Sequence, residues 1–207
     1  MEAKTLLVPA VGLGNVGQLA LEYIHSQLGS QSAVEHVDHL GLLSSCVGRT
    51  ATGLLASSLE FVEVSPTLSL LKVRTPVLPG ASRDFAKFVL QFAQKRGFLK
   101  VMVVGGASAL ALTNEHDFYA TRQFPRVFTV DHKQQQREEE ELGGYIPLSR
   151  TQVNQLRLAG LVPFLVEEFE HNQPHVSRLT AMVLFVFEGE NTEDGNRLGS
   201  EVLRYVQ

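Results

Sequence analysis

The segment Leu6-Leu7-Val8-Pro9-Ala10-Val11-Gly12-Leu13-Gly14-Asn15-Val16-Gly17-Gln18-Leu19-Ala20 passes from an apolar strand through a glycine-rich turn into a helix. The apolar run from Thr5 to Val11 predicts a strand that is buried on both faces. Apolar side chains from Val16 to Leu28 recur on related turns, which predicts an amphipathic helix. A buried strand followed at once by a helix is the opening unit of a layered α/β fold.

The turn in this segment has the spacing of a dinucleotide-binding loop. Gly12, Gly14 and Gly17 spell GxGxxG, in which the glycines allow a tight turn and a close approach of backbone to pyrophosphate. We therefore keep open a nucleotide- or dinucleotide-binding α/β enzyme that uses these three glycines as a phosphate cradle. A simpler interpretation is a close strand-to-helix turn in which Asn15 caps the helix.

Two observations weaken the dinucleotide interpretation. Pro9 removes a backbone donor from a strand that should be central in the sheet. The acid expected on the second strand could only be Glu35 or Asp38, which lie in a weakly apolar, histidine-rich segment. A second glycine-rich turn, with a similar character, is expected at Gly105-Gly106-Ala107-Ser108 after a later strand.

The rest of the chain alternates between strand and helix patterns. The pair 59–64 and 68–74, joined by Ser65-Pro66-Thr67, predicts a hairpin with one wetter face. Together these patterns predict an α/β fold with a mixed, mostly parallel sheet, in one domain over residues 1–207. Further strands are expected at 100–104 and 181–187, and more weakly at 34–40 and 127–130; helices are expected from a cap at Ser82, at 160–169 with Pro163 in the first turn, and at 192–206.

Composition limits the possible functions. The 207 residues are 44% hydrophobic and 19% charged, with a net charge of −4, a single cysteine and no tryptophan. A slightly acidic chain lacks the basic field that binds nucleic acid, and no apolar run is long enough for a membrane span. One cysteine cannot form an internal disulfide, so we expect a soluble, intracellular protein in a reducing compartment. The low share of charge hints at a buried interface.

No set of residues predicts catalysis or a bound metal. Of the seven histidines, only His36 and His39 are close in sequence, and no zinc motif accompanies them. Ser108, His116 and Asp117 could form a hydrolytic set, but no nucleophile elbow presents the serine. Cys46 has no signature of a nucleophile, and the acidic stretch from Lys133 to Glu141 is expected to be a solvated loop. We therefore expect no catalytic, cofactor-binding or metal-binding residues.

The segment from Leu6 to Ala20 also closely resembles the opening of the proteasome assembly chaperone 2 family, whose pattern includes Pro-Ala and then Gly-Asn-Val-Gly-Gln-Leu-Ala. Pro9 belongs to that pattern. A looser match is Ala181-Met-Val-Leu-Phe-Val-Phe-Glu-Gly-Glu-Asn191, followed by the terminal helix. The two matches lie near opposite ends of the chain and in the family's order.

This resemblance implies a three-layer α/β/α sandwich of the nucleoside-phosphorylase type without a working active site. It also implies a chaperone that pairs with assembly chaperone 1 as a heterodimer, binds proteasome α-subunits and promotes α-ring assembly while preventing premature or wrong ring association. Members of the pair can insert a C-terminal hydrophobic-Tyr-any tail between α-subunits. Here Tyr205, Val206 and Gln207 end the chain and do not meet that motif, so they are candidate partner contacts for which packing of the helix is the competing interpretation.

Overall fold

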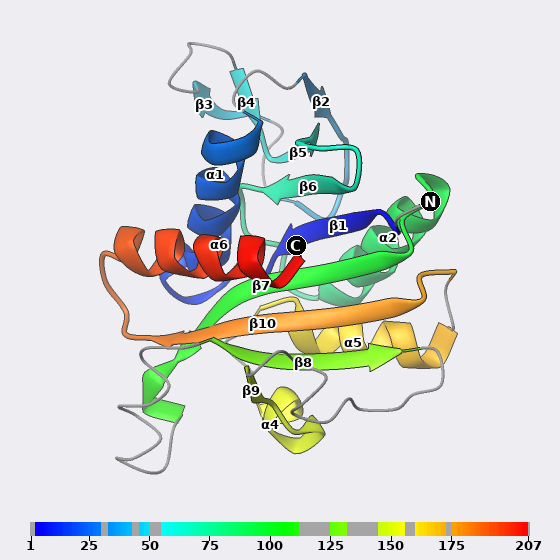
Figure 1. Ribbon diagram of the computed structural model, residues 1–207. Coiled ribbons are helices and arrows are strands. Elements are labelled where there is room, and N and C mark those ends of the chain that lie inside the picture. Colours follow the sequence, from blue (N-terminus) through cyan, green and yellow to red (C-terminus); the bar gives the residue numbers. More distant parts are fainter. Residues whose placement is uncertain are drawn as a thin grey trace.

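The computed structural model describes residues 3–29, 33–42, 46–49, 55–111, 125–131, 145–155, 160–172 and 175–206. An eight-stranded sheet forms the centre of the molecule (Figure 1). In spatial order its strands are β2 (Val34–His36), β5 (Leu59–Glu63), β6 (Leu68–Val73), β1 (Thr5–Pro9), β7 (Lys100–Ser108), β10 (Arg178–Val186), β8 (Arg126–Asp131) and β9 (Ile146–Pro147). A separate two-stranded sheet pairs β3 (Cys46–Arg49) with β4 (Leu55–Ser57).

The middle of the large sheet is parallel. Strands β6, β1, β7 and β10 run in the same direction, while β5 joins β6, β2 joins β5 and β8 joins β10 in antiparallel pairs. The sheet is therefore mixed and mostly parallel, as the sequence predicts. The carboxyl ends of β6, β1, β7 and β10 lie at one edge of the sheet, and their amino ends lie at the opposite edge.

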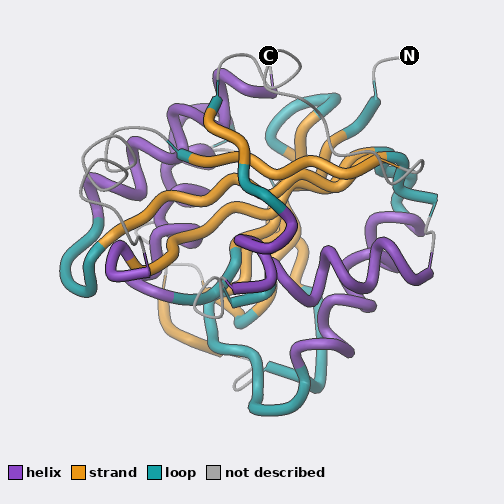
Figure 2. Tube along the Cα trace, turned by 90° about the horizontal axis from the view of Figure 1, so that it is seen from below, coloured by secondary structure: helices purple, strands orange, loops and turns teal. Residues whose placement is uncertain are grey.

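Helices cover both faces of the sheet. Figure 1 shows α1 (Val16–Leu28) and α6 (Thr192–Val206) in front of it, and Figure 2 shows helices on either side of the strands. The other face carries α2 (Ser82–Lys95) and α5 (Val162–Asn172), which pack against each other. The remaining helical segments are η1 (Leu13–Asn15), η2 (Ala109–Ala111) and α4 (Arg150–Gln155). The protein is a three-layer α/β/α sandwich.

Each central strand contributes to two hydrophobic cores. On β1, Leu6 and Val8 face α2 and α5, whereas Leu7 faces α1 and α6, and all three are fully buried. Alternate side chains of a strand point to opposite faces, so a strand covered on both sides must be apolar at every position. This requirement explains the continuous apolar runs that identify β1, β7 and β10 in the sequence. No helix in the described part of the chain is long and apolar enough to cross a membrane.

The hairpin of β5 and β6 differs from the expectation. The two strands pair as predicted, but Glu60 and Lys72, which suggested a wetter face, are only 1% and 4% exposed. They lie opposite each other in the strand register, beneath α1. These two polar positions are buried ion partners, whereas Glu63 at the end of β5 is exposed.

Three local predictions at turns and helix ends are also wrong. Gly105 and Gly106 lie within β7, not in a turn, and they let the connection from β1 to α1 pass closely over the strand: a Cβ at Gly105 would lie 2.7 Å from Ala10 Cβ. Ser82 is the first residue of α2 rather than its cap. Asn15 makes no side-chain capping bond and has a left-handed backbone, with φ 53°.

Candidate functional site

The glycine turn lies at the carboxyl end of β1, next to the ends of β6 and β7. The Ala10 N–H donates to the Val104 carbonyl oxygen at 2.7 Å, and the chain then forms η1 and enters α1 at Val16. Gly14 has φ 63°, which explains why a glycine is favoured there. In open α/β sheets the carboxyl ends of parallel strands are the usual place for ligands, so this turn is the first candidate site.

Protein atoms already fill the space that a phosphate would need. A Cβ at Gly14 would overlap the side chain of Asn191, and a Cβ at Gly17 would overlap the Val104 carbonyl oxygen. Asn191 is 6% exposed and is held there because its amide donates to the carbonyl oxygens of Phe187 and Gly189 at 3.2 and 2.8 Å. The glycines therefore permit close packing between chain segments and do not leave an open cradle.

The acid that a dinucleotide site needs is also misplaced. Glu35 lies on β2, which is three strands away from β1, and its carboxylate pairs with Arg96. The strands that flank β1 are β6 and β7, so neither neighbour carries this acid. The residues present do not fit a dinucleotide.

A cavity of about 250 Å³ lies beside the turn, at the carboxyl ends of β1 and β6. Its wall combines the first turns of α1 with the end of β6, and it includes charged groups that the sequence did not single out. The cavity is lined by Pro9, Asn15, Gln18, Leu19, Leu21, Glu22, Lys72, Val73 and Arg74. This cavity and the charges around it form a polar site at the carboxyl edge of the sheet.

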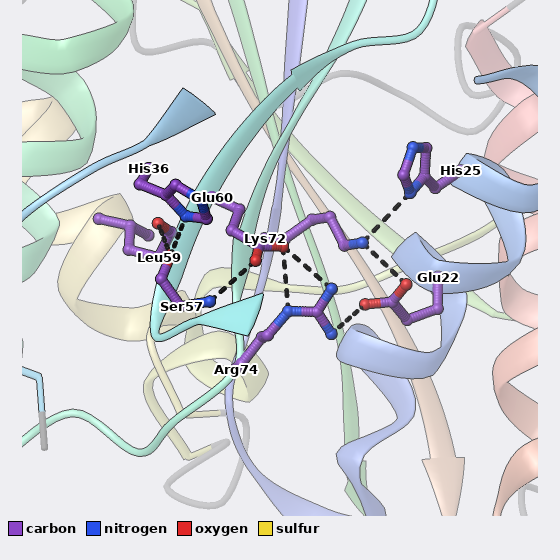
Figure 3. A network of polar contacts seen from close by, with 8 residues as sticks. All are labelled: Glu22, His25, His36, Ser57, Leu59, Glu60, Lys72 and Arg74. Atoms are coloured by element: carbon purple, nitrogen blue, oxygen red, sulfur yellow. Dashed lines mark hydrogen bonds and ion pairs between the residues drawn. The ribbon is translucent and has the colours of Figure 1, made fainter. Parts of the chain in front are cut away.

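Two carboxylates and two cations alternate in this site (Figure 3). The Lys72 ammonium donates to Glu22 at 2.8 Å, and the Arg74 guanidinium contacts Glu22 at 2.5 Å and Glu60 at 3.0 Å. The Ser57 N–H also donates to Glu60, at 2.9 Å. The charges balance, so burial of Glu60 and Lys72 leaves neither ion without a partner.

The chemistry of Lys72 is limited by these partners. Burial lowers the pKa of Lys72 below its ordinary value of 10.5, while the hydrogen bond from Lys72 to Glu22 opposes that shift. Its ammonium donates to Glu22 and lies 3.2 Å from Nδ1 of His25. A lysine held by a carboxylate and an imidazole stabilises the contact between β6 and α1, and it does not present a free amine to a ligand.

His25 should make stability depend on pH. Burial, and then the charge of Lys72, lower the pKa of His25 below its ordinary value of 6.5. The unfolded chain therefore binds a proton that the folded chain excludes, and the free energy of unfolding should fall as pH drops below about 6.5. Urea unfolding at about pH 7.5 and about pH 5.5 should show a smaller loss for His25→Gln than for the parent chain.

A matched variant distinguishes His25 from histidines at the surface. His175 is exposed, so His175→Gln should leave the loss between the two pH values unchanged. Some pH dependence should remain in His25→Gln, because burial also lowers the pKa of His39. An undiminished loss in His25→Gln would contradict the assignment.

The other candidate residues do not form a common site. The His36 ring lies 2.9 Å from the Ser57 hydroxyl, whereas His39 packs between Phe85 and Phe88 on the opposite face of the sheet. No three His, Cys, Asp or Glu residues of the described chain are grouped to hold a metal ion. Ser108 ends β7; His116, Asp117 and the Lys133–Glu141 stretch lie outside the described residues, as does the side chain of Cys46.

The C-terminal residues lie at the opposite edge of the sheet. Tyr205 belongs to the last turn of α6, where its ring packs against Tyr145 at 5.6 Å between centroids and its hydroxyl lies 3.4 Å from that of Thr129. Val206 is partly buried against the same core, and Gln207 lies outside the described residues. Packing of the helix therefore accounts for much of Tyr205, and a partner contact for these residues stays a prediction.

The two buried charges stand out in the sequence, but their pattern predicted a solvated face. Glu60 and Lys72 interrupt otherwise apolar strands, and a hairpin pairs them directly. Lys72 pairs with the carboxylate of Glu22 on α1, and Glu60 pairs with the guanidinium of Arg74, which directly follows β6. Such a pairing depends on how a helix lies over the sheet, which the strand pattern alone does not contain.

Comparison with known proteins relates this architecture to a family. Residues 6–183 match the model of the PAC2 family. Proteasome assembly chaperone 2 of Danio rerio is 28% identical over 111 residues, which are 51% of this chain and 43% of that protein. The matched region thus spans less than half the length of this relative.

Solved structures share the fold at low sequence identity. PbaA of Pyrococcus furiosus, described as an archaeal homolog of proteasome-assembly chaperone, has a TM-score of 0.64 at 13% identity, covering 100% of this chain and 83% of its own. The Campylobacter jejuni 5'-methylthioadenosine/S-adenosyl homocysteine nucleosidase has a TM-score of 0.50 at 7% identity, covering 99% of this chain and 97% of its own. These likenesses establish a nucleosidase-like fold. Because the family model covers most of the sequence, this chain belongs to the PAC2 family.

Proposed function

We propose that the protein is a subunit of a proteasome assembly chaperone. The observation that carries this proposal is the match of residues 6–183 to the PAC2 family, together with similarity to a relative named proteasome assembly chaperone 2. The filled glycine turn and the mutually paired charges around Lys72 support a role that depends on surfaces and not on catalysis.

The proposed mechanism is mass action. The chain would pair with assembly chaperone 1 as a heterodimer in the cytoplasm and nucleus, and the pair would bind proteasome α-subunits. A protein that binds a ring-competent arrangement stabilises that arrangement, and one that covers a subunit face prevents wrong association. The low share of charged residues, 19%, is consistent with a chain that buries part of its surface in such partners.

Affinity purification followed by mass spectrometry tests the proposal. The tagged full chain, expressed in cells of its source, should recover a paralogous partner and free or partly assembled α-subunits, with little mature proteasome. Recovery of the chain as a lone monomer without α-subunits would contradict the proposal.

The C-terminal contact can be tested in the same experiment. If Tyr205, Val206 and Gln207 bind a partner, the variant Val206→Ser with Gln207 deleted should recover less of that partner. The control Ser26→Asp, an exposed change on α1, should recover the normal amount.

The nucleotide-binding alternative makes a different prediction. Because Asn191 occupies the space above Gly14, calorimetric titration with NAD⁺ or adenosine should release no saturable heat. Saturable binding that is lost in Gly14→Val would instead favour an enzyme that uses the Gly12, Gly14 and Gly17 turn. A folded state of Gly14→Val must be verified by circular dichroism, since Gly14 has φ 63°.

A further inference from the structure

A row of polar residues crosses the amino edge of the sheet, opposite the glycine turn. Thr5, Lys100 and Arg178 are the first residues of β1, β7 and β10, and the strand register places them side by side. Partners in register project to the same face of a sheet, which here is the face covered by α6. The last turn of α6, with Tyr205 and Val206, lies over this row.

These residues form the floor of a groove. One cavity of about 330 Å³ is bounded by the row, by Tyr145 and by the end of α6. A second cavity of about 450 Å³ shares Thr5, Lys100 and Val206 with the first and continues toward β6 and the end of α1. Its wall includes the apolar side chains of Leu28, Leu68 and Leu203. The groove is therefore cationic at one end, and its continuation combines these leucines with the polar residues Ser65 and Thr67.

Lys100 and Arg178 carry the positive charge at the cationic end. Neither makes an ion pair with a described residue, and the buried Nε of Arg178 has no hydrogen-bond partner among the described atoms. Asp131 lies opposite Arg178 in the register of β8 and β10 and offsets part of this charge, although it is not part of the groove wall.

The other nearby charges do not cancel this excess. Glu201 already accepts a hydrogen bond from the Tyr145 hydroxyl at 2.9 Å and lies 3.5 Å from Arg204. The C-terminal end of α6 contributes about half a negative charge, and together with the carboxylate of Asp131 this is still less than the two positive charges of Lys100 and Arg178. An anionic group that enters the groove would therefore meet a net positive field.

We propose that this groove binds the free C-terminus of an extended peptide, with its terminal carboxylate at Arg178 and Lys100 and its preceding residues along the second cavity, beside Leu28, Leu68 and Leu203. A guanidinium can hold a carboxylate through two parallel hydrogen bonds, and the Thr5 hydroxyl can donate a third. The chemistry of this groove is independent of the chaperone role.

Peptide titrations followed by NMR test the proposal. The probe is acetyl-Leu-Leu-Val with a free carboxylate, added to the full chain in a buffer without acetate or phosphate. It should shift the backbone amide signals of Thr5, Lys100 and Arg178 in a saturable way. The same peptide with a C-terminal amide should bind at least about 10-fold more weakly, because it lacks the charge-assisted hydrogen bonds.

Variants locate the binding. Arg178→Gln and, independently, Lys100→Gln should each weaken binding of the free-carboxylate peptide by about 10-fold or more. The matched control is Arg83→Gln, which removes an exposed cation on α2, on the opposite face of the sheet, and should bind the peptide normally. Urea unfolding of each variant separates lost binding from lost folding.

Three results would overturn the proposal. The first is an absence of saturable binding by the free-carboxylate peptide. The second is equal binding by its amide, which would mean that the groove recognises apolar side chains alone. The third is equal binding by acetyl-Leu-Glu-Val-amide, which would assign the groove to an acidic side chain and not to a chain terminus.

Discussion

Gly17→Ala is expected to lower the free energy of unfolding by about 2–3 kcal/mol, the upper part of the range for an overpacked core site. Gly17 lies in the first turn of α1, and a Cβ there would overlap the carbonyl oxygen of Val104. This oxygen accepts the Ala10 N–H at 2.7 Å, so it cannot move without disturbing the connection from β1. The added methyl group would therefore separate α1 from β7 or strain both.

The sign of this effect makes the prediction specific. Helix propensity alone favours alanine over glycine by about 1 kcal/mol, so an increase in stability would contradict the close approach of α1 to β7. Ser26→Ala is a suitable control because Ser26 is exposed on the same helix, and its effect should stay within about 0.5 kcal/mol. Urea unfolding followed by far-ultraviolet circular dichroism measures both variants.

Close packing also explains why the sequence predicted the turn but not the residue that fills the space above it. GxGxxG after a strand indicates a tight strand-to-helix connection, and this connection is present. What covers the turn is Asn191, which lies far away in the sequence at the start of α6. Only the folded chain brings these two segments together, so the motif could not distinguish a phosphate cradle from a packing site.

Glycines in α6 give a second example. A Cβ at Gly195 would overlap Leu19, and one at Gly199 would lie 2.7 Å from Tyr23 Cδ1 and 2.9 Å from the Ala20 carbonyl oxygen. The apolar stripe predicted α6 itself with the observed bounds. The role of its two glycines, which is to let α6 pack closely on α1, depends on a contact between helices at opposite ends of the chain.

Strands covered on both faces were the most predictable part of the fold. β1, β7 and β10 are apolar at nearly every position because helices cover each side, and this constraint is visible in a single sequence. The hairpin of β5 and β6 was located correctly, but its charged residues were assigned to solvent. Burial of Lys72 requires the carboxylate of Glu22 on α1, and a strand pattern holds no information about that partner.

Glu22→Ala is the second change expected to have a large effect, a loss of about 2 kcal/mol in the free energy of unfolding. Removal of one partner from a fully buried ion pair costs about 3–5 kcal/mol. The expected loss is smaller here because the Glu22 side chain is 41% exposed, although that of Lys72 is only 4% exposed. The variant would leave the Lys72 ammonium buried, with its charge facing Arg74 and His25.

The opposite truncation should be much milder. In Lys72→Met a flexible apolar side chain fills the site, and Glu22 keeps its 2.5 Å contact with Arg74. The double variant Glu22→Ala with Lys72→Met should therefore regain most of the stability that Glu22→Ala loses. A double-mutant cycle from urea unfolding measures this coupling, and additive effects of the two changes would contradict the ion pair.

The pH dependence of Glu22→Ala provides an independent check on the same pair. Burial already lowers the pKa of Lys72 below 10.5, and loss of the Glu22 carboxylate should lower it further. A lysine whose folded pKa lies below its unfolded pKa destabilises the folded state while it remains charged, and the penalty declines as pH rises through the folded pKa. The stability deficit of Glu22→Ala should therefore shrink as pH rises from about 7 toward 10.5, the ordinary pKa of lysine. Because Lys72→Met carries no ammonium at this position, the double variant should lack that pH dependence. If the stability deficit of Glu22→Ala is equal at both ends of this pH range, a buried, charged Lys72 is excluded as the cause of the deficit.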